Sequence, residues 1–197
     1  MRKVYIDCGS YKGGTIRSFI KNREYDKDFI IYSFEALEAY AGKQEKVLKN
    51  VISMENINLI KKVVWIYDGE IDFYASGRRA GRAGSILKNK KSRRNRATVL
   101  PCLDFSKWII DNFNKDDYII LKMDIEGAEF EVLNKMIKDK SIEYINRLYL
   151  EKHTKRYDGE IDFKYIKKSI QNVEGLEYCT AIEVYYKKHF KKIKNEI

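Results

Sequence analysis

The chain has 197 residues and carries 39 Lys and Arg against 29 Asp and Glu, which gives a formal net charge of +10. Hydrophobic residues make up 44% of the chain, enough to bury a core, so a wholly disordered protein is excluded. No apolar run approaches the ~18 residues that a membrane helix needs, and we expect no membrane insertion.

Strand-like and helix-like patterns alternate in the first half of the chain. A strand over 4–7 precedes a helix over 15–22, and a strand over 29–34 precedes a helix over 36–49. Two further strands are expected over 62–67 and 71–74. They are joined by Asp68-Gly69, a dipeptide that predicts a hairpin.

The alternation continues in the second half. A strand over 98–103 leads into a helix over 105–113, for which Asp104 is the predicted N-cap. The remaining elements are a strand over 118–123, a helix over 128–138, a strand over 147–150, a helix over 163–172 and a β-rich run over 179–186.

The strands are apolar along their whole length and are separated by helices, which indicates βαβ units and a parallel sheet buried on both faces. We therefore predict an α/β fold, a Rossmann-like doubly wound and mostly parallel sheet with helices on both faces. The β-rich run at the end is compatible with an antiparallel edge strand. Because the one proline, Pro101, forms no linker, we predict a single domain over 1–197.

Positive charge is concentrated in two segments. Residues 78–96 contain nine Lys or Arg and no acid, and the tail 187–197 contains five Lys and one Glu. Such segments attract an anionic partner (nucleic acid, an anionic glycan or a nucleotide-linked compound), or they are solvated and only aid solubility. The sequence leaves both interpretations open for the basic loop.

The cysteines and the first residues bear on the compartment. Cys8, Cys102 and Cys179 are far apart and lack the Cys-x-x-Cys spacing of a zinc site. The first residues form a strand-like pattern at once, so we expect no signal peptide. Reduced thiols are typical of the cytosol, and we therefore expect a cytoplasmic protein.

A glycine-containing turn follows the first strand. Asp7-x-Gly9-x-x-x-Gly13 lies between that strand and the first helix. Glycines let a ligand approach the backbone closely, and the start of a helix offers free N–H groups. The segment is neither a dinucleotide fingerprint nor a P-loop, and a glycine turn after a strand also has a plain structural use.

An acid ends the second strand. Glu35 follows Phe34, 22 residues after Gly13. In doubly wound sheets an acid at this place, ~20 residues beyond the glycine turn, accepts hydrogen bonds from a ribose. The alternative is a glutamate stabilised by the dipole of the following helix. We favour ribose binding, because the glycine turn is also present.

Charged residues surround the end of the strand over 118–123. Lys122 and Asp124 alternate there, and Glu126, Gly127 and Glu129 follow at a helix start. Open α/β sheets bind ligands at the carboxyl ends of their strands. An ion pair that caps the helix would explain the helix start, but it would not explain a lysine inside an apolar strand.

These motifs together resemble the FkbM-type family of S-adenosylmethionine-dependent methyltransferases. The family's opening pattern matches Asp7, Gly9 and Gly13, and its Phe-Glu pair matches Phe34-Glu35. Its Lys-x-Asp-x-Glu-Gly-x-Glu segment matches 122–129. Its Leu-Asp element matches Leu103-Asp104, and its late Glu and His match Glu151 and His153.

The resemblance implies a class I methyltransferase fold, S-adenosylmethionine as cofactor, and O-methylation of a sugar, a glycan or another small hydroxyl compound. A basic loop would suit an anionic or nucleotide-linked acceptor. Under this reading, Gly9 and Gly13 contact the methionyl part and the sugar of the cofactor. Glu35 binds the ribose hydroxyls, Asp7 orients the loop, and Ser85 is a further candidate for the lining of the site.

Acceptor chemistry is expected at the ends of the later strands, from Asp124, Glu151 and His153. The usual pKa of histidine lies near neutrality, so His153 is a candidate general base, although the spacing alone favours a surface or strand-end histidine without a catalytic role. Lys122 would fix Asp124 or neutralise charge on the acceptor. A divalent metal ion between Asp124 and Glu151 is an alternative, but two carboxylates do not make a ligand set, and no metal site is predicted.

Two other functions share this scaffold. In an RNA 2′-O-methyltransferase the basic loop would hold phosphates, and acceptor binding would depend steeply on salt. A non-catalytic nucleic-acid-binding module would use the same basic segments and bind no cofactor. The glycine turn and Glu35 count against the second alternative.

Overall fold

The computed structural model describes residues 1–22, 25–75, 84–87, 97–153 and 163–179. Of the predicted basic loop over 78–96, only 84–87 fall within these ranges, and the tail over 187–197 lies outside them. Within the described ranges, no helix combines the length and the apolar character needed to cross a membrane.

The main sheet has six strands in the order β3-β2-β1-β7-β8-β9, and each neighbouring pair is parallel. Its strands are β1 (Lys3–Cys8), β2 (Phe29–Phe34), β3 (Ile57–Ile60), β7 (Tyr118–Met123), β8 (Arg147–Leu150) and β9 (Glu177–Cys179). This is the order of a doubly wound Rossmann-like sheet, so the predicted α/β fold is confirmed. The strand β9 is parallel to β8, and residues 180–186 of the β-rich run lie outside the described residues.

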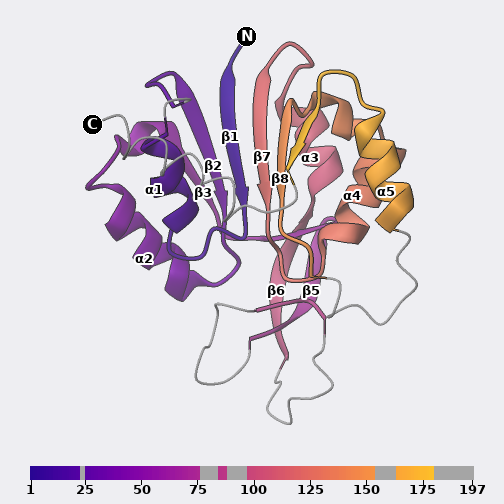
Figure 1. The fold of residues 1–197 in the computed structure, drawn as a ribbon. Helices are drawn as coiled ribbons and strands as arrows, with labels where there is room; N and C mark the ends of the chain where they lie inside the picture. Colours follow the sequence, from indigo (N-terminus) through magenta and orange to yellow (C-terminus); the bar gives the residue numbers. More distant parts are fainter. Residues whose placement is uncertain (23–24, 76–83, 88–96, 154–162, 180–197) are drawn as a thin grey trace.

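Helices cover both faces of this sheet. Figure 1 shows α1 (Gly14–Ile20) and α2 (Glu38–Leu48) on one side of the molecule, and α3 (Phe105–Asn112), α4 (Glu129–Lys138) and α5 (Phe163–Gln171) on the other. Successive residues of a strand point to opposite faces, so Tyr5 of β1 packs with Phe19 of α1, while Val4 joins the cluster that contains Phe130 of α4. The apolar character of the central strands follows from this double coverage.

A second sheet has three strands in the order β4-β6-β5. They are β4 (Val63–Trp65), β5 (Gly69–Tyr74) and β6 (Ala97–Asp104). The predicted hairpin is wrong, because β6 lies between the other two strands, parallel to β4 and antiparallel to β5. The Asp68 carboxylate accepts a hydrogen bond from the Asp104 N–H at 3.2 Å, so the Asp68-Gly69 turn passes around the end of β6.

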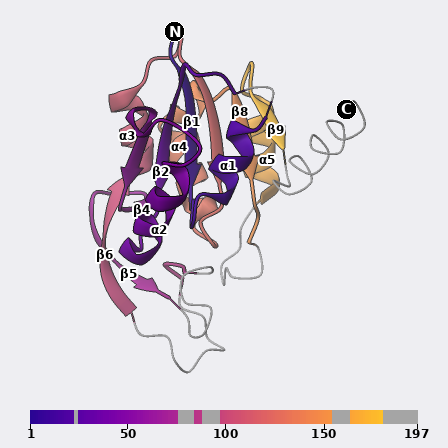
Figure 2. The same ribbon diagram turned by 90° about the vertical axis from the view of Figure 1, so that its left-hand side faces the viewer.

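The transition from β6 to α3 links the two sheets. Asp104 ends β6, and its side chain accepts a hydrogen bond from the Lys107 N–H at 3.0 Å, which confirms the predicted N-cap. Figures 1 and 2 show β5 at the end of the molecule opposite the amino terminus, where the carboxyl ends of the main strands also lie. The second sheet therefore stands beside the edge of the main sheet at which ligands bind in such folds.

Candidate functional site

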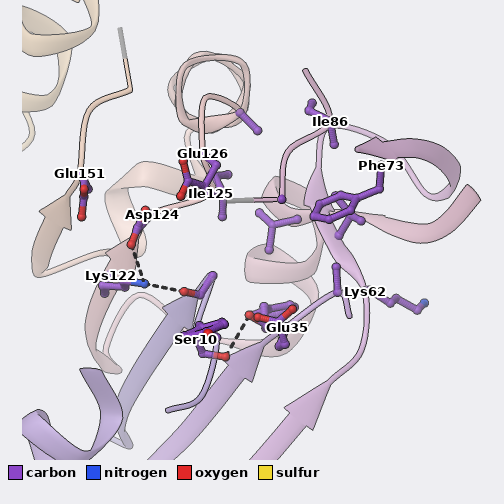
Figure 3. Close-up of a pocket in the computed structure, with 18 of the residues that line it drawn as sticks. Ser10, Glu35, Lys62, Phe73, Ile86, Lys122, Asp124, Ile125, Glu126 and Glu151 are labelled. Carbon is purple, nitrogen blue, oxygen red and sulfur yellow. Dashed lines mark hydrogen bonds and ion pairs between the residues drawn. The ribbon is translucent and has the colours of Figure 1, made fainter. Parts of the chain in front are cut away.

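A cavity of about 320 Å³ lies at the carboxyl ends of β1, β2 and β7 (Figure 3). Five of the nine residues predicted for the site line it, namely Gly9, Glu35, Lys122, Asp124 and Glu151. Residues of the second sheet and the segment beside it close another side, among them Val63, Phe73, Gly84 and Ile86. The chain order of the sheet reverses between β1 and β7, and such a switch point is where doubly wound folds bind ligands.

The turn after β1 is clamped onto the neighbouring strands. The N–H groups of Gly9 and Ser10 both donate to the Phe34 carbonyl oxygen at 3.1 Å. Gly9 has a φ of 81°, and a Cβ there would lie 1.9 Å from the Asp124 carbonyl oxygen. Only glycine therefore lets the turn approach the end of β7 this closely.

A buried network fixes this turn from below. The Lys122 side chain is 1% exposed, and its Nζ lies 2.9 Å from Asp7 Oδ1 and 3.6 Å from Asp124 Oδ2. The ammonium group also donates to the carbonyl oxygens of Gly9 at 2.9 Å and Cys8 at 3.2 Å. Burial alone would lower the pKa of Lys122, but the Asp7 and Asp124 carboxylates outweigh it and raise the pKa. A lysine is accommodated in this apolar strand because its ammonium group binds Asp7 and the carbonyl oxygens of Cys8 and Gly9, and so links β7 to β1 and the glycine turn.

Glu35 places a carboxylate at the end of β2. It is 8% exposed, and its Oε1 accepts a hydrogen bond from the Leu37 N–H at 2.9 Å. Burial raises the pKa of Glu35 to about 7, although backbone hydrogen bonds from Leu37 and Tyr11 partly offset the burial. A carboxyl group of this kind accepts hydrogen bonds when ionised and donates one when protonated.

Glu129 orients His153. Its carboxylate is fully buried, and it accepts hydrogen bonds from the N–H groups of Ile125 at 2.9 Å and Gly127 at 2.8 Å. Its Oε1 also lies 2.8 Å from His153 Nδ1. Burial lowers the pKa of His153, but the hydrogen bond that its ring donates to Glu129 and the nearby carboxylates outweigh it and raise the pKa. One buried acid thus shapes the turn before α4 and aims the imidazole.

The other ring nitrogen of His153 faces three acids. Its Nε2 lies 3.3 Å from Glu126, 3.7 Å from Glu151 and 3.8 Å from Asp124. In Figure 3 these three carboxylates lie on one side of the cavity, and Glu35 lies apart from them. The cavity therefore has two regions. One is an acidic end, lined by Asp124, Glu126 and Glu151, with the His153 imidazole beside it, and the other contains Glu35.

The family is decided by comparison over most of the chain. The family model described as the methyltransferase FkbM domain matches residues 7–179. The chain belongs to the FkbM methyltransferase family. The match begins at Asp7 and ends at Cys179, so it contains the β1 turn, Glu35 and the whole acidic end. The family expected from the motifs is therefore confirmed.

The chain is also similar to a solved structure. It is the methyltransferase FkbM from Methylobacillus flagellatus KT, which is 13% identical to this chain with a TM-score of 0.45. The alignment covers 70% of this chain and 30% of that structure, so the chain spans under a third of its length. A comparison with curated proteins gave no match.

Four residues that the FkbM resemblance assigned to the site lie outside the cavity lining, namely Asp7, Gly13, Ser85 and His153. Asp7 lies beneath the β1 turn and pairs with Lys122. Gly13 precedes α1 with a φ of 75°, and a Cβ there would meet Gln44 and Leu48 of α2. The Ser85 hydroxyl donates to the Glu126 carbonyl oxygen at 2.7 Å. Asp7 and Ser85 thus each contact a residue that does line the cavity, Lys122 and Glu126 respectively.

Two acids of the FkbM site received no role from the sequence. The sequence places Glu126 and Glu129 at a helix start within the segment 122–129 and predicts no role for either. In the structure the first lines the cavity and the second orients His153. The sequence signal that could have indicated these roles is a pair of acids on either side of a glycine, between a strand and a helix. Phe73 and Ile86 also line the cavity, and nothing in their sequence surroundings marked them.

Proposed function

We propose that this FkbM family member is an S-adenosylmethionine-dependent O-methyltransferase that acts on a hydroxyl group of a sugar, a glycan or a similar small acceptor. The observation that carries the proposal is one cavity with two chemically distinct regions, Glu35 beside the glycine turn and the acidic end at β7 and β8. Family membership supports methyl transfer, and the residues of the cavity support the division of labour between cofactor and acceptor.

The residues near Glu35 fit the cofactor. Glu35 would bind the ribose hydroxyls, since a carboxylate can accept two hydrogen bonds from a diol. Gly14 begins α1 on the cavity wall, and a Cβ there would meet nothing within 4 Å, so the helix start is open to a ligand. When bound, S-adenosylmethionine supplies a methyl group on a sulfonium centre that is already a good leaving group.

The acidic end fits a neutral hydroxyl acceptor. Asp124, Glu126 and Glu151 line it, and their oxygens can accept hydrogen bonds from several hydroxyl groups. Phe73 and Ile86 add apolar surface, which suits the C–H faces of a sugar ring. Negative charge would repel an anionic group at this end, so any anionic part of the acceptor has to lie farther from the reacting hydroxyl.

Methylation of a hydroxyl oxygen requires the loss of its proton. Asp124 and Glu151 line the cavity and can accept that proton, and Lys122 holds Asp124 in place. A positioned proton acceptor typically contributes roughly 10²–10⁴-fold in rate. We therefore expect Asp124→Asn to lower turnover by a factor in this range while leaving cofactor affinity within a few-fold of the wild type.

Calorimetric titration of S-adenosylmethionine and S-adenosylhomocysteine tests the cofactor part. We expect micromolar binding by the wild type and by the control Glu38→Gln, which removes an exposed carboxylate on α2. Glu35→Gln should bind at least tenfold more weakly. A wild-type chain that binds neither compound would overturn the proposal.

Transfer of a labelled methyl group then tests the acceptor part. Incorporation into free sugars or glycans, lost in Asp124→Asn, would support the proposal. Incorporation into RNA, with a steep salt dependence and no transfer to sugars, would overturn the acceptor class while leaving the methyltransferase intact.

A further inference from the structure

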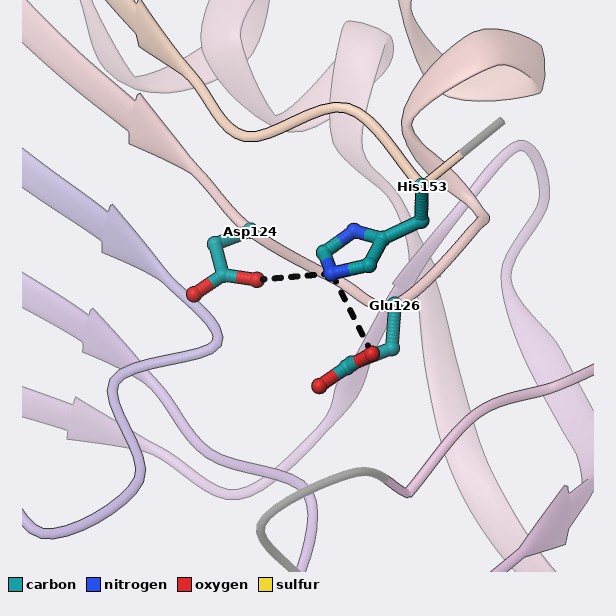
Figure 4. Close-up of side chains that lie close together, drawn as sticks. All are labelled: Asp124, Glu126 and His153. Atoms are coloured by element: carbon teal, nitrogen blue, oxygen red, sulfur yellow. Dashed lines mark ion pairs between the residues drawn. The ribbon is translucent and has the colours of Figure 1, made fainter. Parts of the chain in front are cut away.

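Ligand atoms of three side chains converge at the acidic end. One atom each from Asp124, Glu126 and His153 lies within 4.8 Å of the others (Figure 4). Asp124 and Glu126 come from the connection between β7 and α4, and His153 comes from the segment after β8. The fold, rather than local sequence, therefore brings an imidazole and two carboxylates together.

The spacing suits one small cation. Protein oxygen and nitrogen ligands lie ~2.0–2.2 Å from such an ion, so two neighbouring ligands are about 3 to 3.6 Å apart. His153 Nε2 lies 3.3 Å from Glu126 Oε2 and 3.8 Å from Asp124 Oδ1. Small side-chain movements would bring all three ligands into coordination distance.

The imidazole is prepared for coordination by Glu129. A carboxylate is acceptor-only, so the short contact between Glu129 and His153 Nδ1 assigns the proton to Nδ1. In the neutral ring the Nε2 lone pair then points toward Asp124 and Glu126. Metal-bound histidines almost always donate their other N–H to a carboxylate, a backbone carbonyl or a water in this way. The fully buried Glu129 is itself fixed by two backbone N–H groups, which makes the orientation rigid.

The negative charge of the cluster also favours the binding of a cation. Carboxylates of Asp124, Glu126, Glu129 and Glu151 surround one imidazole ring, which carries at most one positive charge. Lys122 approaches Asp124 Oδ2, but its shorter ion pair is with Asp7. The other oxygen of Asp124, Oδ1, is the one directed at His153. A cation beside Oδ1 would offset the repulsion between Asp124 and Glu126 without displacing the lysine.

We propose that Asp124, Glu126 and His153 bind a divalent first-row transition-metal ion, with Glu129 as the residue that positions His153. An imidazole combined with carboxylates is a ligand set that Mn²⁺ and Zn²⁺ accept. Both acids line the cavity, so an ion that they bind would lie at the cavity wall. Metal binding does not depend on the proposed methyl transfer, whereas the place of the ion beside the acceptor does rest on that function.

Titration of Mn²⁺ into the full chain, followed by the electron paramagnetic resonance signal of the free ion, tests the site directly. We expect one ion per chain in the wild type and in the control Glu55→Gln, which removes an exposed carboxylate distant in sequence from the cluster. Glu126→Gln, Asp124→Asn and His153→Gln should each weaken binding at least tenfold. Glu129→Gln should weaken it by roughly 10–100-fold through the imidazole alone.

Two results would overturn the proposal. One is a wild-type chain that binds no Mn²⁺ at millimolar concentration, and the other is binding that Glu126→Gln and Asp124→Asn leave unchanged. Both substitutions keep the size of the side chain, so they test the site even if His153→Gln fails to fold. Circular dichroism identifies any variant that has lost its structure. Because no cofactor is present in the titration, its failure would not bear on S-adenosylmethionine binding.

Discussion

Lys122 shows how one buried charge organises the site. The lysine is 1% exposed and contacts Asp7, Asp124 and the carbonyl oxygens of the glycine turn. A buried ion pair need not stabilise a fold more than an apolar pair would, but removing one partner leaves the other charge uncompensated. The value of Lys122 therefore lies in holding three backbone segments in one arrangement.

Replacing Lys122 by Met should be strongly destabilising. The variant keeps the aliphatic stem but leaves Asp7 buried without its partner, which typically costs about 3–5 kcal/mol. Urea unfolding at neutral pH measures the change. The double variant Lys122→Met with Asp7→Asn should recover part of the loss, and a double variant as unstable as the sum of both single variants would show that the pair is not coupled.

The raised pKa of Glu35 predicts a pH-dependent cofactor affinity. Burial raises that pKa from 4.5 to about 7, so the carboxyl group is mostly protonated below pH 7 in the free protein. If the ionised form binds the ribose hydroxyls, affinity should increase as the pH rises through about 7. Glu35→Gln should flatten this dependence. Calorimetry with S-adenosylhomocysteine at several pH values checks both.

The raised pKa of Glu35 affects folding stability in the opposite direction to cofactor affinity, because stability falls as the pH rises. Between pH 4.5 and about 7 the folded chain retains a proton on Glu35 that the unfolded chain releases. The contribution of Glu35 to stability is therefore present at low pH and is lost as the pH rises through about 7. The difference between the wild type and Glu35→Gln isolates it, and parallel pH profiles of unfolding would contradict it.

The site residues at the carboxyl ends of the parallel strands were predictable from the sequence. The carboxyl ends of parallel strands meet at one edge, so Gly9, Glu35, Lys122 and Asp124 could be placed together from strand order alone. The contact between Glu129 and His153 could not, because it depends on how the segment after β8 turns back over the start of α4. Ser85 was predicted near the site, but its contact with Glu126 depends on the path of a long connection.

At the scale of elements, the glycine turn after β1 offers a matched pair of substitutions. Gly9→Ala combines a left-handed φ, which costs ~1–2 kcal/mol in an L-residue, with a clash against the backbone of Asp124 that adds ~1–3 kcal/mol. Gly14→Ala meets no atom within 4 Å and needs no positive φ. We expect the first to lower stability by about 2–5 kcal/mol and the second to leave it nearly unchanged.

The two variants should separate the effect of the glycine turn on folding stability from its effect on ligand binding. Gly14 lines the cavity at the start of α1, so a methyl group there should weaken S-adenosylhomocysteine binding although the fold is intact. Thermal unfolding together with calorimetry measures both quantities. Full cofactor affinity in Gly14→Ala would show that the ligand does not approach the start of α1.

Secondary structure was predictable where one short pattern determines it. The apolar runs of β1, β2, β7 and β8 and the Asp104 cap depend on neighbouring residues only. The predicted pairing of β4 with β5 is wrong. A dipeptide such as Asp68-Gly69 indicates a turn, but it does not determine whether the strands on either side of the turn pair with each other or with a third strand, here β6. The short strand β3 (Ile57–Ile60) was missed, since its four residues INLI carry no turn signal of their own.

At the scale of the whole molecule, the net charge of the chain is positive, whereas the charged residues that line the cavity are mostly acidic. The chain carries a net charge of +10, yet acids outnumber bases in the described cavity, where Glu35, Asp124, Glu126 and Glu151 stand against Lys62 and Lys122. Long-range attraction of an anionic molecule and its local repulsion from the acidic end would then act on different parts of the same ligand. An acceptor with an anionic part distant from a neutral hydroxyl would satisfy both.

Ligand binding should stabilise the molecule as a unit. A compound that binds only the folded state adds about 2.7 kcal/mol at a concentration of 100 Kd. For a chain of this size that amounts to a rise in Tm of about 5–10 °C. We expect S-adenosylhomocysteine to produce it in the wild type and not in Glu35→Gln at the same concentration. An equal shift in both would place the ligand away from Glu35.

The two walls of the cavity are held in place by different parts of the chain. Strand pairing in the main sheet uses no described residue between Ile60 and Tyr118, and that interval supplies β4, β5, β6 and the wall with Phe73 and Ile86. Substitution of that wall leaves the hydrogen-bond ladder beneath Glu35 and Asp124 untouched. Under the proposed function, substitutions in that wall would alter the acceptor that is bound and leave the strand pairing that places Glu35 and Asp124 unchanged.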